Sequence, residues 1–227
     1  LSVLDLDVKN GKVRDYRYHL LPVFSNLLEA DPAMAKHIET VRAPYKKQLE
    51  EELAVTDDLL FRRGNFNGTW DDLICDALLS EREADIALSP GFRWGASLIP
   101  GADITREDIF NATAMSYPNA YRTEFTGEFL HVVLEDVADN IFNPDPYYQQ
   151  GGDMVRTGGM NYVLEPLAAA GQRISEMTLD DGTPIEAGKK YKVAGWATVG
   201  SQAPGPAIWD VVAEYLRTTG GARVDSL

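Results

Sequence analysis

The amino-acid sequence predicts an α+β protein in which a mixed β-sheet is packed with helices. From about residue 56, short apolar or alternating stretches typical of strands are mixed with longer stretches of helical periodicity. Their order lacks the regular strand–helix–strand rhythm of a parallel α/β protein. Apolar residues make up 44% of the 227 residues and charged residues 25%, which is typical of a globular chain with a sizeable core.

The first segment, residues 1–25, is predicted to be a β-hairpin. Two alternating apolar and polar stretches flank Asn10-Gly11, and this dipeptide is the strongest short signal for a hairpin turn. A two-stranded hairpin is only marginally stable by itself. We therefore expect these strands to belong to a larger sheet.

The second segment, residues 26–55, is predicted to be a linker helix. Asp31 followed by Pro32 is typical of a helix start, with an N-cap and a proline in the first turn. The helical pattern runs over Ala33–Ala54, and Pro44 should end or kink it. Many Lys and Glu residues in its second half indicate a solvated surface.

The third segment, residues 56–227, contains the alternating helices and strands. We predict strands over Asp85–Ser89, Tyr121–Phe125, Arg173–Leu179 and Lys190–Trp196. Helices are predicted to begin at Thr69, at a capping box formed by Thr105 and Asp108, at Thr126 and at Ile208. The apolar residues of the third of these helices show helical spacing: Phe129, Val132, Val133, Val137 and Ile141.

Charge and composition exclude several classes of function. Lys and Arg number 21 against 35 Asp and Glu, so the net charge of −14 argues against binding to nucleic acid. No apolar run reaches about 18 residues, so no membrane span is predicted. The single cysteine, Cys75, excludes a disulfide within the chain, and on its predicted helix it is best interpreted as a small buried apolar residue.

The sequence offers no metal centre and no catalytic residue that we can identify. The three histidines, His19, His37 and His131, stand apart from one another and from any ligand spacing typical of metal sites. A nucleophile elbow and a phosphate-binding glycine loop are both absent. We therefore expect no metal ligand in this chain.

A first candidate loop, residues 89–95, reads Ser-Pro-Gly-Phe-Arg-Trp-Gly and directly follows a predicted buried strand. Such a loop can present backbone N–H groups and the guanidinium of Arg93 to an anion. The alternative is a tight turn in which Arg93 pairs with a neighbouring carboxylate.

A second candidate loop, residues 145–162, contains two glycine pairs and three tyrosines among several amides. This composition fits a binding wall that offers aromatic and amide contacts. The alternative is a loop without a binding role, in which the glycines supply positive φ angles. The residues alone favour neither interpretation.

Taken in order, these segments resemble the C-terminal domain of the 5′-nucleotidase family. Asp85-Ile86-Ala87-Leu88 and the Gly and Arg of the next loop resemble its Ala-Asp-x-Ala-x-x-Asn-Gly-Gly-Gly-Ile-Arg segment. Further matching segments are Gly101 with Ile104-Thr105, Tyr117-Pro118-Asn119, Thr126-Gly127-Glu128 and Lys190-Tyr191-Lys192-Val193-Ala194. The resemblance implies a 5′-nucleotidase C-terminal-domain-like fold over residues 56–227. It also implies that residues 1–25 are the last strands of an absent N-terminal metallophosphoesterase domain.

Within the family, the chain is similar to the thiosulfohydrolases of the bacterial Sox sulfur-oxidation system. The segments that carry this similarity are residues 89–95, 147–156 and 158–162. The nucleotidase pattern is altered where it would bind a nucleotide, because only Gly91 and Arg93 of its Gly/Arg loop remain. Ser201-Gln202-Ala203-Pro204-Gly205-Pro206 replaces a segment that clamps the base, and Tyr117 matches one stacking ring. The second ring has no sure equivalent, although Trp196 lies nearby.

This resemblance implies a periplasmic hydrolase that acts during thiosulfate oxidation. Two manganese ions would be held by the absent N-terminal domain, and this fragment alone would be inactive. The substrate would be a cysteine S-thiosulfonate on the swinging arm of the SoxYZ carrier, and sulfate would be released. No nucleic acid or membrane partner is implied. The implied substrate-binding residues are Gly91, Arg93, Tyr117, Asn119, Tyr148, Met160, Asn161 and Tyr162.

Two other functions stay open from the sequence. The chain is alternatively the C-terminal domain of a 5′-nucleotidase or related phosphoesterase that binds a nucleotide. A third possibility is a binding module without enzymatic activity that has lost its metal domain.

Overall fold

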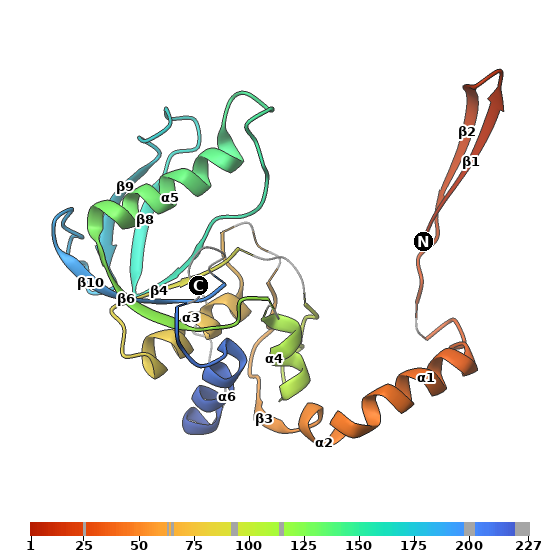
Figure 1. Cartoon of the computed structure of the whole chain (residues 1–227), viewed down its shortest axis with the longest axis horizontal. Helices are drawn as coiled ribbons and strands as arrows, with labels where there is room; N and C mark the ends of the chain where they lie inside the picture. Colours follow the sequence, from red (N-terminus) through yellow and green to blue (C-terminus); the bar gives the residue numbers. More distant parts are fainter. Residues whose placement is uncertain are drawn as a thin grey trace. The chain divides into compact units, whose positions relative to one another are not determined.

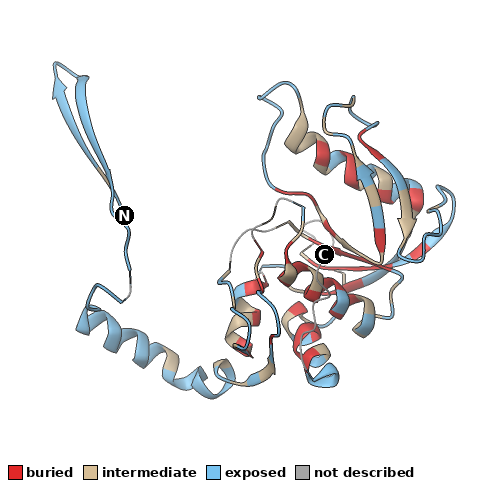
Figure 2. Cartoon of the chain, turned by 180° about the vertical axis from the view of Figure 1, so that it is seen from behind, coloured by how far each residue is buried: buried red, intermediate tan, exposed pale blue. Residues whose placement is uncertain are grey.

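The computed structural model describes residues 1–24, 26–62, 64, 66–91, 95–113, 116–197 and 203–220. The chain forms two compact units, Leu1–Lys47 and Gln48–Leu227 (Figure 1). Every buried residue that the structure describes lies in the second unit (Figure 2). No helix of the described chain combines the length and the apolar character needed to cross a membrane.

The first unit begins with the predicted hairpin, which the structure confirms. Strands β1 (Ser2–Lys9) and β2 (Lys12–Leu20) pair in antiparallel register. Asn10 and Gly11 form the turn with φ angles of 52° and 72°, as a two-residue turn of this kind requires. Among the described residues, neither strand pairs with any other.

A helix follows the hairpin, but it is shorter than predicted. The Asp31 side chain accepts a hydrogen bond from the Met34 N–H at 2.8 Å, which confirms the predicted N-cap. Pro44 lies in a 3₁₀ turn that interrupts the helix. The pieces are α1 (Pro32–Arg42), η1 (Ala43–Tyr45) and α2 (Lys46–Leu49).

The last residues of the predicted linker helix form a strand instead. Strand β3 (Glu52–Val55) pairs antiparallel with β5 (Asp103–Thr105). Leu53 and Ala54 pack against the apolar core of the second unit. This long-range pairing satisfies the backbone groups of residues 52–55, and a reading of local helical periodicity could not detect it.

A four-stranded mixed sheet in the order β6–β10–β4–β7 is the centre of the second unit. The two central strands are parallel to each other, and each outer strand is antiparallel to its neighbour. The sequence predicted three of these four strands, β4, β6 and β10, with small differences at their ends, and did not predict β7. Their bounds are β4 (Ile86–Ser89), β6 (Tyr121–Thr126), β7 (Arg156–Gly158) and β10 (Lys190–Gly195).

Helices cover both faces of this sheet. One face, to which Ala87 and Ala194 contribute, packs with α3 (Thr69–Glu81), α4 (Arg106–Ala112) and α6 (Ile208–Thr219). The opposite face, to which Ile86, Leu88 and Val193 contribute, packs with α5 (Gly127–Phe142) and with the hairpin of β8 (Met160–Leu164) and β9 (Ile174–Leu179). This alternation of successive residues between two cores is the period of a β-strand. The α+β prediction is therefore confirmed.

The helix starts predicted at Thr105 and Thr126 are confirmed, and the helical spacing noted along α5 includes both exposed and partly buried residues. Thr105 and Asp108 form the full capping box, and the Thr126 hydroxyl accepts from the Phe129 N–H at 3.2 Å. Phe129 and Val132 are largely exposed, whereas the residues that α5 buries in the core include Leu130, Leu134 and Ala138. Both sets have helical spacing, so the periodicity alone did not distinguish them.

Candidate functional site

The carboxyl ends of the parallel strands β4 and β10 lie side by side, with Leu88 in register with Gly195. The next residues, Ser89 and Trp196, are both buried. The Trp196 indole Nε1 donates a hydrogen bond to the Ser89 Oγ at 2.9 Å. The first candidate loop therefore begins at a fixed point on the carboxyl edge of the sheet.

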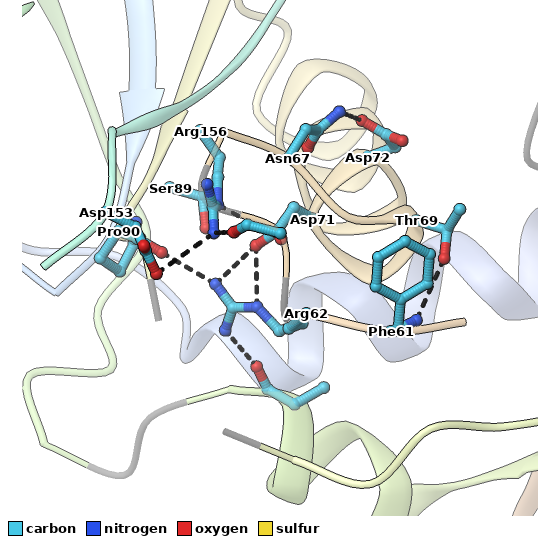
Figure 3. Close-up of polar contacts among 12 residues, drawn as sticks. Phe61, Arg62, Asn67, Thr69, Asp71, Asp72, Ser89, Pro90, Asp153 and Arg156 are labelled. Atoms are coloured by element: carbon cyan, nitrogen blue, oxygen red, sulfur yellow. Dashed lines mark hydrogen bonds and ion pairs between the residues drawn. The ribbon is translucent and has the colours of Figure 1, made fainter. Parts of the chain in front are cut away.

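Arg62 lies beneath the start of this loop and is 2% exposed. Its Nε donates to the Asp71 Oδ1 at 2.8 Å, and its Nη2 donates to the Pro90 carbonyl oxygen at 2.8 Å (Figure 3). Its Nη1 donates to the Ala112 carbonyl oxygen at the end of α4. The guanidinium carbon lies 6.0 Å from the centroid of the Trp196 ring. One side chain thus joins four separate segments.

Arg156 is a second buried arginine in the same place. It opens β7 in register with Ser89 and has no exposed surface. Its Nε lies 3.3 Å from the Asp71 Oδ2 and its Nη2 lies 3.7 Å from the Asp153 Oδ2 (Figure 3). The same Nη2 donates to the Gly64 carbonyl oxygen. Asp71 is therefore shared between two guanidinium groups.

We call Arg62, Asp71, Asp153 and Arg156 the inner cluster. Its two positive and two negative formal charges cancel, so the cluster as a whole provides no excess charge for attracting an anion. Burial raises the pKa of Asp71, although both guanidinium groups oppose this shift, and burial lowers the pKa of Arg62. The cluster fixes the surrounding backbone through its hydrogen bonds.

The glycines of the first candidate loop are required by close packing. A Cβ atom at Gly91 would overlap the Met154 carbonyl oxygen. Gly95 has a φ of +98°, and a Cβ there would lie 3.1 Å from the Asn111 carbonyl oxygen. Arg93 lies outside the described residues, as do Phe92 and Trp94. The anion-binding role predicted for Arg93 therefore stays a prediction.

A cleft of about 520 Å³ brings together Met160, Asn161 and Tyr162 of the predicted site. Asn161 donates to the Asp180 carboxylate at 3.0 Å at its rim. Burial raises the pKa of Tyr162, so its hydroxyl remains a hydrogen-bond donor at neutral pH. The other lining residues are Phe66, Asn67, Asp72, Cys75, Asp76, Thr157, Gly158, Gly159, Leu164 and Asp180. Such a lining can receive a polar, uncharged chain through amide and aromatic contacts.

The second candidate loop is not a single loop, because β7 and β8 begin inside it. Its first part carries Tyr147 and Tyr148, which are 95% and 66% exposed. Tyr148 is not among the residues that line the cleft. Its glycines Gly151, Gly152 and Gly159 have positive φ angles, as the alternative interpretation expected.

Tyr117 and Asn119 lie in another part of the carboxyl edge. The Tyr117 carbonyl oxygen accepts from the Ala197 N–H at 3.1 Å, and the Tyr117 side chain is about half exposed. Asn119 donates to the Ala203 carbonyl oxygen at 3.2 Å. Trp196, in contrast, is 3% exposed. Of these two aromatic residues, only Tyr117 therefore offers a free ring face.

The inner cluster was not predicted from the sequence. One signal was available, because Asp71 shares helical spacing with Ile74, Cys75 and Leu78, which are buried on one face of α3. A carboxylate on an apolar helix face requires a buried partner. The partners at positions 62 and 156 are too distant in the sequence to be identified from it.

Metal ligands are not assembled in the described part of the chain. None of its His, Cys, Asp and Glu residues form a group of three or more that could hold a metal ion. His131 lies 3.1 Å from the Ile174 carbonyl oxygen and 3.7 Å from Glu135. Cys75 is buried, as predicted, and burial raises the pKa of its thiol well above the usual value.

Comparisons with known proteins identify the family. The model of the 5′-nucleotidase C-terminal domain matches residues 56–213. A search of curated proteins found no match. The sulfate thiohydrolase SoxB of Thermus thermophilus has a similar structure, with a TM-score of 0.91 and 33% identity. The similarity covers 99% of this chain and 43% of SoxB.

Two nucleotidase structures share the fold at lower identity. A 5′-nucleotidase precursor from Thermus thermophilus has a TM-score of 0.80 and 16% identity, over 100% of this chain and 48% of its own. A 5′-nucleotidase from Staphylococcus aureus has a TM-score of 0.64 and 17% identity, with the same coverage. The chain thus spans less than half the length of these relatives. Because the family model matches most of the chain, this protein belongs to the 5′-nucleotidase family and contains its C-terminal domain.

Proposed function

We propose that this chain is the substrate-binding part of a periplasmic thiosulfohydrolase. The enzyme would hydrolyse cysteine S-thiosulfonate on the SoxYZ carrier and release sulfate during thiosulfate oxidation. The observation that carries this proposal is the 33% identity to SoxB over 99% of the chain. The nucleotidase precursor from Thermus thermophilus is only 16% identical over the same length.

In this proposal, the metal chemistry belongs to another segment of the protein. The described residues do not fit a metal centre, so two manganese ions and the attacking water would be supplied by an N-terminal metallophosphoesterase domain. The exposed apolar residues of the hairpin support the existence of such a domain. Leu4, Leu6 and Val8 pair with Tyr18, Tyr16 and Val13, and all six side chains are exposed. An apolar face of this size is normally covered.

The residues of this chain would hold the substrate. Arg93 would donate hydrogen bonds to the sulfonate oxygens, because a guanidinium matches the geometry of such an oxyanion. Gly91 lets the loop approach Asp153 and Met154 closely. Met160, Asn161 and Tyr162 would contact the carrier arm in the cleft. Water would bond through its oxygen to the sulfonate sulfur and release its protons. The S–S bond would break with its electron pair staying on the carrier as a persulfide, and sulfate would leave.

The remaining predicted residues would contact the carrier outside the cleft. Tyr148 is exposed on the loop before β7, and Tyr117 and Asn119 border the end of β10. Aromatic rings and amides at these positions suit contacts with a glycine-rich peptide.

The buried Trp196 ring argues against the nucleotidase alternative. A nucleobase held between two rings gains about 1–3 kcal/mol from each stacking face. Trp196 is 3% exposed and is hydrogen-bonded to Ser89, which leaves Tyr117 as the one candidate face that we identified. The buried position of the Trp196 ring therefore supports a substrate that has no nucleobase.

The test uses the protein that joins this chain to a metal-binding domain of the family. We expect sulfate release from a thiosulfonate-loaded carrier, measured by ion chromatography, and little phosphate release from AMP. Arg93→Ala should remove about 3 kcal/mol of transition-state stabilisation, as the loss of an oxyanion donor does in other enzymes. Arg173→Met is the matched control, because Arg173 is a buried arginine paired with Asp139 in another layer. Efficient AMP hydrolysis, or wild-type turnover by Arg93→Ala, would contradict the proposal.

A further inference from the structure

We propose that Arg62 is a positioning residue, which holds Ser89–Gly91 and Gly95, the described residues of segment 89–95, in place without contacting the substrate. This inference rests on the proposed function of that segment in anion binding. Arg62 is 2% exposed and is not among the residues that line the cleft. Its effect on an anion must therefore be transmitted through the backbone that it holds.

Arg62 joins the two described ends of this segment. At the first end, its Nη2 donates to the Pro90 carbonyl oxygen at 2.8 Å. At the second end, Gly95 approaches the Asn111 carbonyl, and the Nη1 of Arg62 donates to the next carbonyl along, that of Ala112. A single planar group thus fixes the separation between Pro90 and the end of α4, which Gly95 approaches.

Asp71 fixes the orientation of this guanidinium. Its Oδ1 accepts from the Arg62 Nε at 2.8 Å and lies 2.7 Å from the Arg62 Nη2. Its Oδ2 faces the Nε of Arg156 at 3.3 Å. Because Asp71 is in the first turn of α3, the position of this helix determines where both guanidinium groups are held. A lysine has no rigid fork, so it could not hold Asp71, Pro90 and Ala112 in the same geometry.

Trp196 provides a reporter for this arrangement. Its ring lies 6.0 Å from the Arg62 guanidinium carbon, and its indole N–H donates to Ser89, the first residue of the segment. A displaced Arg62 should therefore alter the indole N–H signal of Trp196. This readout requires no ligand.

The experiment compares Arg62→Lys and Arg62→Met with Arg173→Met in the 227-residue chain. Arg173 is also 2% exposed and ion-paired, at 2.8 Å from Asp139, but it lies between α5 and β9. Trp196→Phe assigns the indole signal in ¹⁵N spectra. Hydrogen exchange of that N–H and the affinity for sulfate and thiosulfate are then measured in each folded variant.

In Arg62→Met we expect the Trp196 signal to shift and its hydrogen exchange to become about tenfold faster, as for a weakened buried hydrogen bond. Sulfate should bind about tenfold more weakly, because the backbone that flanks Arg93, its proposed donor, is displaced. Arg62→Lys should recover part of both effects, and Arg173→Met should show neither. If Arg62→Met does not fold, the Trp196 signal, its hydrogen exchange and the sulfate affinity are measured in Arg62→Lys and Asp71→Asn instead.

Two results separate this inference from the proposed function. An unchanged Trp196 signal and unchanged affinity in folded Arg62 variants would overturn the positioning role. A wild-type chain that binds neither sulfate nor thiosulfate, with the Trp196 signal still altered in the Arg62 variants, would overturn the anion-binding function and uphold the positioning role.

Discussion

Two ionic clusters of the second unit use the same residue types in opposite surroundings. In the inner cluster, the side chains of Arg62, Asp71, Asp153 and Arg156 are at most 2% exposed. In what we call the outer cluster, Arg106 is 10% exposed, and Glu51, Asp210 and Arg217 are 38–57% exposed. The ion-pair distances overlap, so the difference between the clusters is their access to water.

This difference determines what each cluster contributes. Removing charges from water costs free energy that a buried pair recovers only when its hydrogen bonds are complete. The Nη1 of Arg156 has no hydrogen-bond partner among the described residues. The inner cluster is therefore poorly explained as a source of stability and well explained as a fixed geometry beneath residues 89–91. The outer cluster joins β3, α4 and α6 at the surface, where solvent weakens each pair.

The largest effect is expected from Asp71→Asn. This change keeps the shape of the side chain but replaces one carboxyl oxygen by an NH2 donor that faces arginine N–H groups. A buried charged donor then loses its acceptor, so the free energy of unfolding should fall by about 3 kcal/mol or more. Urea denaturation measures the loss. Asp72→Asn is the control, because Asp72 pairs with the amide of Asn67. A loss below about 1 kcal/mol in Asp71→Asn would mean that the inner cluster behaves like the outer one.

The sequence predicts the features that depend on interactions between neighbouring residues. It does not predict those that depend on contacts between distant parts of the chain. The turn at Asn10-Gly11 and the caps at Thr105 and Thr126 are local, and the structure confirms them. The strand β7 has three residues, which is too short for a periodic signal. Its position beside β4 and the pairing of Arg156 with Asp71 depend on contacts between distant parts of the chain.

The candidate site was predictable to a similar extent. Gly91 was selected through the family resemblance, and its close approach to Met154 explains why a glycine is needed there. Its role in substrate binding stays a prediction. Met160, Asn161 and Tyr162 do line one cleft. The buried state of Trp196 followed from its bond to Ser89, 107 residues away, and no sequence pattern reports such a contact.

A second, smaller effect is expected from Gly91→Ala, which tests whether the backbone above the inner cluster is closely packed. The added Cβ would overlap the Met154 carbonyl, and the required shift should cost about 1–3 kcal/mol of unfolding free energy. Gly188→Ala is the matched control, because a Cβ there meets no atom within 4 Å. Equal stability of the two variants in urea would show that the backbone at Gly91 yields easily.

The smallest change in stability is expected from Glu51→Gln in the outer cluster. Glu51 pairs with Arg217 at 2.5 Å and with Arg106 at 3.5 Å, but its side chain is 38% exposed. Exposed pairs contribute about 0.2–1 kcal/mol each, so urea denaturation at neutral pH should detect a loss of that order. A loss as large as that of Asp71→Asn would remove the contrast between the two clusters.

Glu51 and Asp71 should also have opposite effects on how the free energy of unfolding depends on pH. The hydrogen bond from Arg217 lowers the pKa of Glu51 below 4.5 in the folded state. Its stabilising effect is therefore present above pH 4.5 and is lost as the pH falls through the folded-state pKa. Burial raises the pKa of Asp71 above 3.8, so its protonation favours the folded state below that value, and this contribution is lost as the pH rises through the folded-state pKa.

Measuring the free energy of unfolding from pH 3 to pH 7 separates these contributions. Below about pH 4.5, stability should fall less steeply with decreasing pH in Glu51→Gln than in the wild type, because one proton-linked loss is removed. In Asp71→Asn the fall should be steeper, because a group that favours folding at low pH is missing. If both variants changed the slope in the same direction, burial would not dominate the titration of Asp71. Its carboxylate would then behave as an ordinary ion-paired group, stabilised by two guanidinium groups despite the absence of water.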